Sequence, residues 1–152
     1  MLGGPEPQHV PAARVSASFF DVFGVSPERG RAFGREADQR ADRVAVVTHT
    51  FWQRRMNADE AAVGRAITLD GEAITVVGVM PAAFKAPAEL REAQLFLPLN
   101  PDGMGGQNRG GRYLNVAARL RADASSGQAL ADMARSRGGW SRPSRTATAD
   151  AA

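Results

Sequence analysis

Side chains that could do metal or acid–base chemistry are few and scattered along this sequence. The two histidines, His9 and His49, are forty residues apart, and there is no cysteine. Metal sites need several clustered ligands, and the lack of cysteine also excludes disulfides and thiolate ligands. We therefore predict no metal site. His49 is expected to be an ordinary polar residue just before a helix.

Two pairs of carboxylates, Glu36/Asp38 and Asp59/Glu60, lie in polar stretches. A carboxyl group acts as a general acid near neutral pH only where its surroundings keep it protonated, and a solvated loop does not do so. We therefore expect both pairs on a solvated surface. Ser26 lies in Gly-Val-Ser-Pro-Glu, which is similar to a nucleophile elbow but lacks the second glycine and has proline after the serine. No catalytic residue is predicted.

The segments 103–106 and 109–112, Gly-Met-Gly-Gly and Arg-Gly-Gly-Arg, form a glycine-rich stretch. Phosphate-binding loops precede a helix, but here a strand is expected to follow. Lys85 is the only lysine, so the lysine of a P-loop is absent as well. We predict a surface loop and no cofactor site. A single Arg-Gly-Gly-Arg element leaves nucleic-acid binding open as an alternative.

Composition favours one globular domain with a real core, because 43% of the 152 residues are hydrophobic and 23% are charged. The net charge of +3 is uneven: residues 104–152 carry 8 basic and 3 acidic side chains, a net +5. This basic half supports the alternative of a small basic nucleic-acid-binding protein, against that of a solvated tail. No apolar run reaches the ~18 residues that span a bilayer, and residues 1–9 lack a signal-peptide pattern. From these features, the isolated chain is expected to be soluble and to stay where it is made.

Residues 63–80 predict a β-hairpin. Asp70-Gly71 is typical of a two-residue type I′ turn, with apolar and β-branched residues on both sides. This turn would pair Leu69 with Glu72, Thr68 with Ala73, and Ile67 with Ile74. Pro81 ends the second strand because it has no amide hydrogen to donate.

The remaining pattern predicts further short elements. Strands are expected at residues 10–15, 44–47, 95–97 and 113–120, and residues 29–42 are expected to be polar and anchored by Phe33. Helices are expected to begin at the capping-box pairs Ser18/Asp21, Thr50/Gln53 and Ser125/Gln128, with a short helical turn from Asp59. The predicted fold class is α+β, a single domain with a mixed, mainly antiparallel sheet and two or three short helices. Residues 1–9 are expected to form an irregular leader, 10–134 the domain, and 135–152 a basic disordered tail.

Four segments, taken in order, resemble one protein family. Residues 14–33, 44–55, 63–84 and 112–120 are similar to the MacB-like periplasmic core domain of ABC transporter permeases that carry an FtsX-like segment. The resemblance runs from about residue 10 to residue 133.

The resemblance implies a non-catalytic domain on the periplasmic side of the membrane, inserted between the first two membrane helices of a permease. Its partners would be the rest of the permease and its ATPase subunit, and a periplasmic adaptor. Its role would be protein contact and the transmission of motion during export. It implies no catalytic, cofactor or metal residue, and it identifies neither the partner-binding residues nor the transported substrate. Because the expected membrane helices are missing, we expect a fragment of a full permease.

Overall fold

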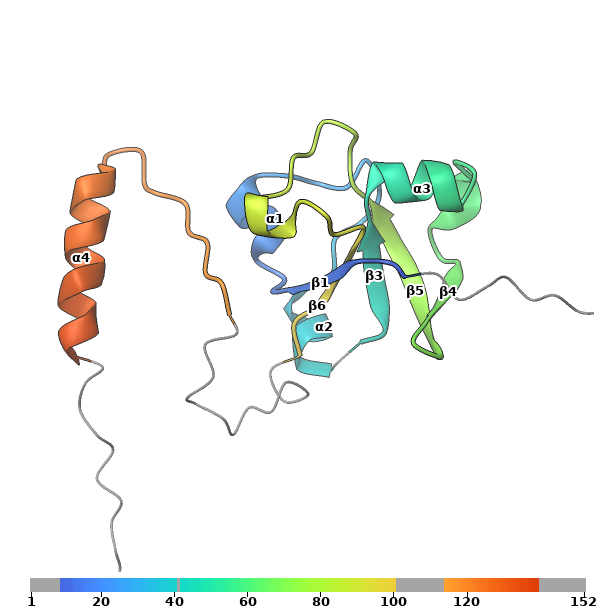
Figure 1. Cartoon of the computed structure of the whole chain (residues 1–152), viewed down its shortest axis with the longest axis horizontal. Helices are drawn as coiled ribbons and strands as arrows, with labels where there is room; N and C mark the ends of the chain where they lie inside the picture. Colours follow the sequence, from blue (N-terminus) through green and yellow to red (C-terminus); the bar gives the residue numbers. More distant parts are fainter. Residues whose placement is uncertain (1–8, 41, 101–113, 140–152) are drawn as a thin grey trace, which may run out of the picture. The chain divides into compact units, whose positions relative to one another are not determined.

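The computed structural model describes residues 9–40, 42–100 and 114–139 (Figure 1). The chain divides into two compact units, residues 1–115 and 116–152, and each is described by itself. The first unit contains a six-stranded sheet, and the second contains one helix. None of the helices in these described ranges is both long and apolar enough to cross a lipid bilayer.

The sheet of the first unit is mixed. Its strands are β1 (Ala12–Val15), β2 (Arg29–Gly30), β3 (Val44–Val47), β4 (Ala66–Leu69), β5 (Glu72–Val79) and β6 (Leu95–Pro98). Their order is β1-β6-β3-β5-β2, with β4 also paired to β5. The β1–β6 and β3–β5 pairs are parallel, and the other three pairs are antiparallel. The predicted α+β class with a mixed, mainly antiparallel sheet is confirmed.

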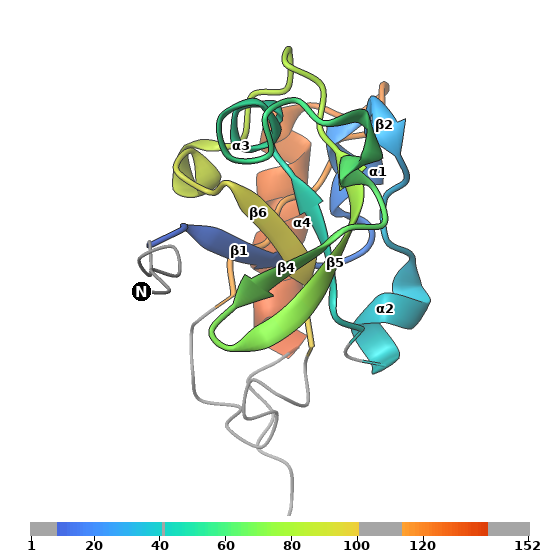
Figure 2. The same cartoon turned by 90° about the vertical axis from the view of Figure 1, so that its right-hand side faces the viewer.

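The β4–β5 hairpin has the predicted turn and register. Asp70 and Gly71 have φ of 51° and 81°, as a type I′ turn requires. Leu69 pairs with Glu72, and Ile67 pairs with Ile74. Figure 2 shows this hairpin in green, with β3 and β6 beyond β5.

The β3–β5 pair contains an irregularity. Ala45 pairs with Val76, but Val46 pairs with Gly78, so Val77 has no opposite residue on β3. One residue more on one strand than on its neighbour is the definition of a β-bulge. On the other edge of β5, the Val77 carbonyl accepts the Arg31 N–H at 2.9 Å, next to the β2–β5 pairs.

Three α-helices of the first unit are short. In α1 (Phe19–Phe23), Gly24 ends the helix with φ of 62°, as its lack of Cβ allows. The helix α2 (Arg35–Arg40) was not expected from its polar sequence. The described part of the unit also contains the helix α3 (His49–Arg55) and the 3-10 helices η1 (Glu60–Ala62) and η2 (Ala88–Leu90).

The predicted start of α1 at Ser18 is confirmed, but its capping-box hydrogen bond is absent, and the predicted cap of α3 is wrong. Ser18 makes no side-chain hydrogen bond to α1, and its hydroxyl oxygen lies 3.0 Å from that of Ser16 instead. The N-cap of α3 is Thr48 and not Thr50, because Thr48 Oγ1 accepts the Phe51 N–H at 3.3 Å. The sequence pattern misplaced this helix start by two residues because a threonine stands at both positions.

The core of the sheet is apolar on both faces. One cluster contains Phe19, Phe20, Phe33 and Phe96, and a second contains Phe51, Trp52, Met56, Val76 and Leu95. A third, smaller cluster contains Ala45, Ile74 and Leu97. The central strand β3 fits the prediction of a strand buried on both faces, since residues 45–47 are fully buried. Among the described residues, no polar or charged residue is fully buried.

The second unit contains α4 (Ser126–Gly139), whose predicted capping box is confirmed. Ser125 Oγ accepts the Gln128 N–H at 3.2 Å, and Gln128 Oε1 accepts the Ser125 N–H at 2.9 Å. The helix includes residues 135–139, which were expected to be disordered. Residues 114–120 form no strand, so the strand predicted at 113–120 is wrong over the described residues. An alternation of polar and apolar residues is typical of a strand, but a strand also needs a neighbouring strand to pair with.

Candidate functional site

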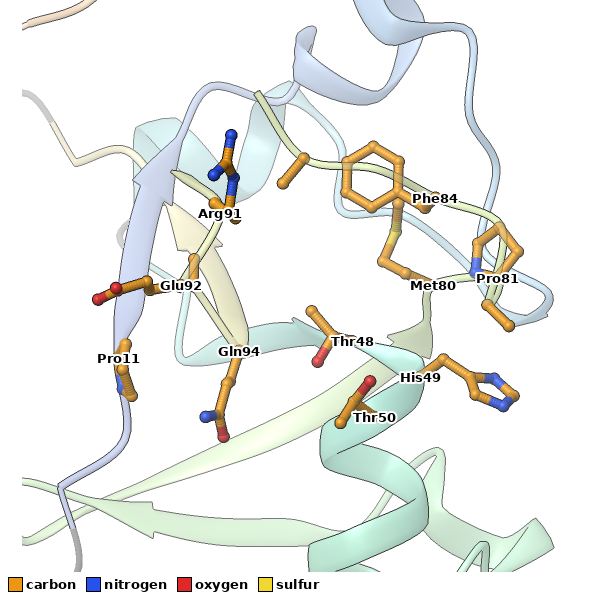
Figure 3. A pocket seen from close by; sticks show the side chains of 13 residues that line it. Pro11, Thr48, His49, Thr50, Met80, Pro81, Phe84, Arg91, Glu92 and Gln94 are labelled. Carbon is orange, nitrogen blue, oxygen red and sulfur yellow. The ribbon is translucent and has the colours of Figure 1, made fainter. Parts of the chain in front are cut away.

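A cavity of about 520 Å³ opens where β3 and β5 end and β6 begins (Figure 3). Its walls come from segments that follow those strand ends. The Thr48 N–H donates to the Gln94 carbonyl at 3.0 Å, and the Gln94 N–H donates to the Pro11 carbonyl at 2.8 Å. Pro81 turns the chain away from β5, so residues 80–94 cross over this end of the sheet. The cavity is therefore bounded by backbone that hydrogen bonds hold in place.

The lining of the cavity is apolar on one side and polar on the other. Met80 is 1% exposed, and the Phe84 ring lies 6.0 Å from the buried ring of Phe96, so this side is apolar. Thr48, His49 and Gln94 bring polar groups to the other side, as Figure 3 shows. Exposed Arg91 and Glu92 add charges of opposite sign to the lining. An apolar floor with a polar margin suits contact with another molecule.

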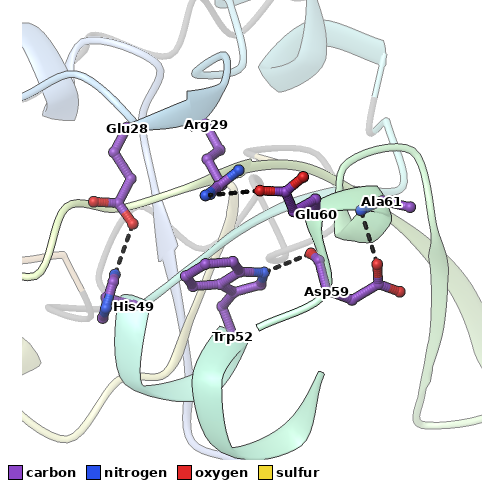
Figure 4. A network of polar contacts seen from close by, with 7 residues as sticks. All are labelled: Glu28, Arg29, His49, Trp52, Asp59, Glu60 and Ala61. Atoms are coloured by element: carbon purple, nitrogen blue, oxygen red, sulfur yellow. Dashed lines mark hydrogen bonds and ion pairs between the residues drawn. The ribbon is translucent and has the colours of Figure 1, made fainter. Parts of the chain in front are cut away.

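Next to the cavity, His49 belongs to a polar network that joins three elements (Figure 4). His49 Nδ1 lies 2.6 Å from Glu28 Oε1, and the two side chains are 22% and 31% exposed. The contact is a hydrogen bond with neutral histidine and an ion pair with protonated histidine. It fixes the start of α3 against the segment that leads into β2.

Trp52 is the centre of this network. Its indole Nε1–H donates to the Asp59 carbonyl at 2.8 Å, and its ring packs edge-on against that of His49. The Arg29 guanidinium carbon lies 4.8 Å from the Trp52 ring centre, and Arg29 also reaches Glu60 at 3.8 Å. A cation over an indole face is attracted by the electron-rich ring. The network thus ties α3, η1 and β2 together.

The carboxylate pair Asp59/Glu60 has a structural role here. Asp59 Oδ1 accepts the Ala61 N–H at 2.9 Å, which confirms the short helical turn expected from Asp59. Its Oδ2 pairs with Arg65 at 3.2 Å. Glu60 is exposed and reaches Arg29 of β2 at the long distance given above. Asp59 therefore holds the entry to the β4–β5 hairpin, while Glu60 lies on the solvated surface, as expected.

The two residues of the second carboxylate pair, Glu36 and Asp38, differ in their exposure to solvent. Glu36 is exposed, as expected. Asp38 is not simply solvated: its Oδ2 accepts the Ala17 N–H at 2.8 Å, and its Oδ1 is buried without a hydrogen-bond partner. The expectation of a solvated surface is therefore wrong for Asp38, which joins α2 to the segment after β1. A contact across 21 residues leaves no local signal in the sequence.

The remaining candidates are not brought together. Ser26 is exposed on the loop between α1 and β2, and His9 is exposed near the start of the described chain. Within the described residues, no group of three histidine or acidic side chains is placed to hold a metal ion. The glycine-rich stretch at residues 103–112 lies outside the described residues. Sequence reasoning missed the Glu28–His49 contact and the cavity, because both depend on segments distant in the chain.

Several solved structures share this fold. The periplasmic region of MacB from Actinobacillus actinomycetemcomitans is 16% identical, with a TM-score of 0.58, and the match covers 82% of this chain and 54% of that one. The extracellular domain of the noncanonic ABC-type transporter YknZ from Gram-positive bacteria is 15% identical, with a TM-score of 0.55, over 82% and 62% of the two chains. A domain of a putative permease protein from Porphyromonas gingivalis is 21% identical, with a TM-score of 0.50, over 81% and 57%.

These structures define the class of fold, a mixed α+β domain. The model of the MacB-like periplasmic core domain family matches residues 3–136, and the chain belongs to this family. The resemblance seen in the sequence is thereby confirmed. The chain spans between 54% and 62% of the solved structures described above. No curated protein matches the sequence.

Proposed function

We propose that this chain is a non-catalytic extracytoplasmic part of an ABC transporter permease, which contacts other proteins and transmits their movement. The observation that carries the proposal is the family match over residues 3–136. Two of the similar structures are a periplasmic region and an extracellular domain of transporters, which supports the same location for this chain.

The use of the polar side chains supports a role without bond chemistry. Asp59 caps a helix, Asp38 binds a backbone amide, and Glu28 fixes His49. These side chains are thereby engaged in holding segments of the fold in place. The sheet has an apolar core on both faces, and these contacts join it to the neighbouring segments. Such a closely packed body is suited to move as one unit when a partner pushes on it.

The cavity at the ends of β3 and β5 is the proposed contact region. Interfaces concentrate binding energy in apolar or aromatic anchors surrounded by a polar margin. Phe84, which is only partly buried, supplies the apolar part, and Arg91 and Glu92 supply the charged margin. The proposed partners are the remaining permease with its ATPase subunit, and a periplasmic adaptor protein.

Site-specific photocrosslinking in the source bacterium tests this proposal. A photoreactive amino acid is placed at position 91, beside the cavity, or at position 43. Arg43 is an exposed arginine that pairs with the exposed Glu72, away from the cavity lining, which makes it a matched control. We expect transporter subunits or an adaptor protein to be captured from position 91 much more than from position 43.

Two results would contradict the proposal. One is capture of cytoplasmic proteins or nucleic acid from position 91. The other is complete protection of the chain from protease added to cells whose outer barrier has been opened, because an extracytoplasmic domain is accessible to that protease.

A further inference from the structure

A segment that we call the strap, residues 81–93, crosses the end of the sheet beside the cavity (Figure 3). Hydrogen bonds hold the chain at both ends of the strap. Just before it, the Met80 N–H donates to the Val47 carbonyl at 2.8 Å. Just after it, the Gln94 N–H donates to the Pro11 carbonyl at 2.8 Å. Several strap residues line the cavity, so the strap forms one of its walls.

Between these two ends, the hydrogen bonds of the strap are all local. The Phe84 N–H donates to the Pro81 carbonyl at 2.9 Å, and the Leu90 N–H donates to the Pro87 carbonyl at 2.9 Å. Among the described residues, no hydrogen bond or ion pair joins residues 81–93 to the rest of the chain. Because local turns do not fix a segment to its surroundings, only side-chain packing holds the strap in place.

The segment around β2 is fixed to the sheet in a different way. The Glu28 N–H donates to the Val79 carbonyl at 2.8 Å, and the Arg31 N–H donates to the Val77 carbonyl at 2.9 Å. That segment can move away from β5 only if these bonds break. The strap can leave the sheet without breaking any such bond, which is typical of segments that open locally.

Two large apolar side chains hold the strap against the core. Phe84 and Leu90 are the only ones among its thirteen residues, five of which are alanine. Together with Ala93, they are partly buried and pack against the core cluster that contains Phe19 and Phe96. The Phe84 ring centre lies 6.3 Å and 6.0 Å from the ring centres of these two residues. A segment with so few apolar contacts lies at the low end of local stability.

We propose that the strap opens as one unit while the sheet stays folded, and that opening uncovers the cavity floor and releases Phe84 and Leu90 to contact a partner. The structure described above is the closed form, in which Met80 is only 1% exposed. A partner that binds the open form has an apparent affinity that falls as the open fraction falls. The use of the opening in partner contact rests on the proposed function, whereas the opening itself does not.

The natural chain contains its own probe of the strap, because Lys85 is its only lysine. A lysine-specific protease therefore cuts the full chain at a single peptide bond, inside the strap. We expect cleavage through local opening, at a rate that hardly changes with urea while the sheet stays folded. Leu90→Ala should raise this rate at least about tenfold, the effect of 1.4 kcal/mol. Val25→Ala is the matched control and should leave the rate unchanged, because Val25 packs partly buried against the same cluster from outside the strap.

A cysteine introduced under the strap tests whether the opening reaches the cavity, because the natural chain has no cysteine. Iodoacetamide should modify Met80→Cys much faster than Val76→Cys, which probes a fully buried position of the second core cluster. Adding Leu90→Ala should accelerate the modification of Met80→Cys only. Leu90 is not part of the cavity lining, so its truncation does not uncover position 80 directly. Circular dichroism checks that each variant folds.

Three results would overturn the proposal. The first is cleavage at Lys85 that increases with urea in step with global unfolding. The second is a Leu90→Ala variant with unchanged rates of cleavage and of modification. The third is modification of the two cysteine variants at the same rate. All these measurements use the chain without a partner, so failure to capture transporter proteins from position 91 would contradict the proposed function and not the opening.

Discussion

Trp52 shows how one residue can organise an end of this sheet. Its side chain is 6% exposed, yet it makes a polar contact through its indole N–H and faces a guanidinium group. Phenylalanine would keep much of the apolar contact but would lose the bond to the Asp59 carbonyl. A large amphipathic side chain is therefore required where α3, η1 and β2 meet.

At the same scale, the cap of α3 gives a direct prediction. Thr48→Ala should lower the free energy of unfolding by about 1 kcal/mol, because the Phe51 N–H loses its acceptor. Thr50→Ala is the matched control and should change it by less than about 0.5 kcal/mol, as expected for an exposed position. Urea denaturation followed by circular dichroism measures both. Equal losses in the two variants would contradict the assignment of Thr48 as the cap.

Among elements, β2 is held against β5 by an unusually close approach of backbones. Gly30 pairs with Gly78, and the Glu28 N–H donates to the Val79 carbonyl at 2.8 Å. A Cβ at position 78 would lie 2.4 Å from the Arg31 carbonyl oxygen, and one at position 30 would lie 2.2 Å from that of Val77. Glycine is needed at both positions because backbone, and not a movable side chain, occupies the space.

Gly78→Ala should therefore destabilise the protein by about 1–3 kcal/mol, the usual cost of inserting a methyl group into a packed region. Gly34→Ala is the control, because a Cβ there meets nothing within 4 Å. Thermal denaturation compares the two variants with the natural chain. A Gly78→Ala protein as stable as the Gly34→Ala protein would show that β2 can move away from β5 at little cost.

Elements that depend on residues close together in the chain could be predicted from the sequence. The β4–β5 hairpin depends on Asp70-Gly71 and on the alternation beside it, and the capping box of α4 lies within four residues. The helix α2 was missed because it buries little besides Ala37, at 5% exposure. The parallel pairing of β1 with β6 joins residues more than 80 positions apart, which no local pattern encodes. The Glu28–His49 contact of the site could not be predicted for the same reason, because the folded sheet brings together two residues that are 21 positions apart.

At the scale of the whole molecule, charge is the property that separates the two hypotheses drawn from the sequence. The net charge of +3 arises from the basic stretch 104–152, and much of that stretch lies outside the described residues. In the first unit, Arg29, Arg43 and Arg65 each face a carboxylate. Paired arginines of this kind provide little free positive charge for a phosphate backbone.

We accordingly expect no measurable binding of the full chain to duplex DNA or single-stranded RNA, even at low ionic strength, where counterion release favours association most. Fluorescence anisotropy with labelled oligonucleotides measures this. A basic protein of similar size that is known to bind nucleic acid serves as the positive control. Binding that weakens steeply as salt is added would favour the nucleic-acid alternative over a transporter role.

The bulge at Val77 has a mechanical consequence. Strands paired without irregularity can slip by two residues and still present the same faces to the core. Here the unmatched residue sits at one rung only, between the pairs Ala45–Val76 and Val46–Gly78, and its carbonyl is engaged by Arg31. A slide of β3 along β5 would have to move this unmatched residue to another pair of positions, so we expect the bulge to oppose sliding of the two central strands. We then expect a load applied along β3 to displace β5 with it instead of shearing the sheet.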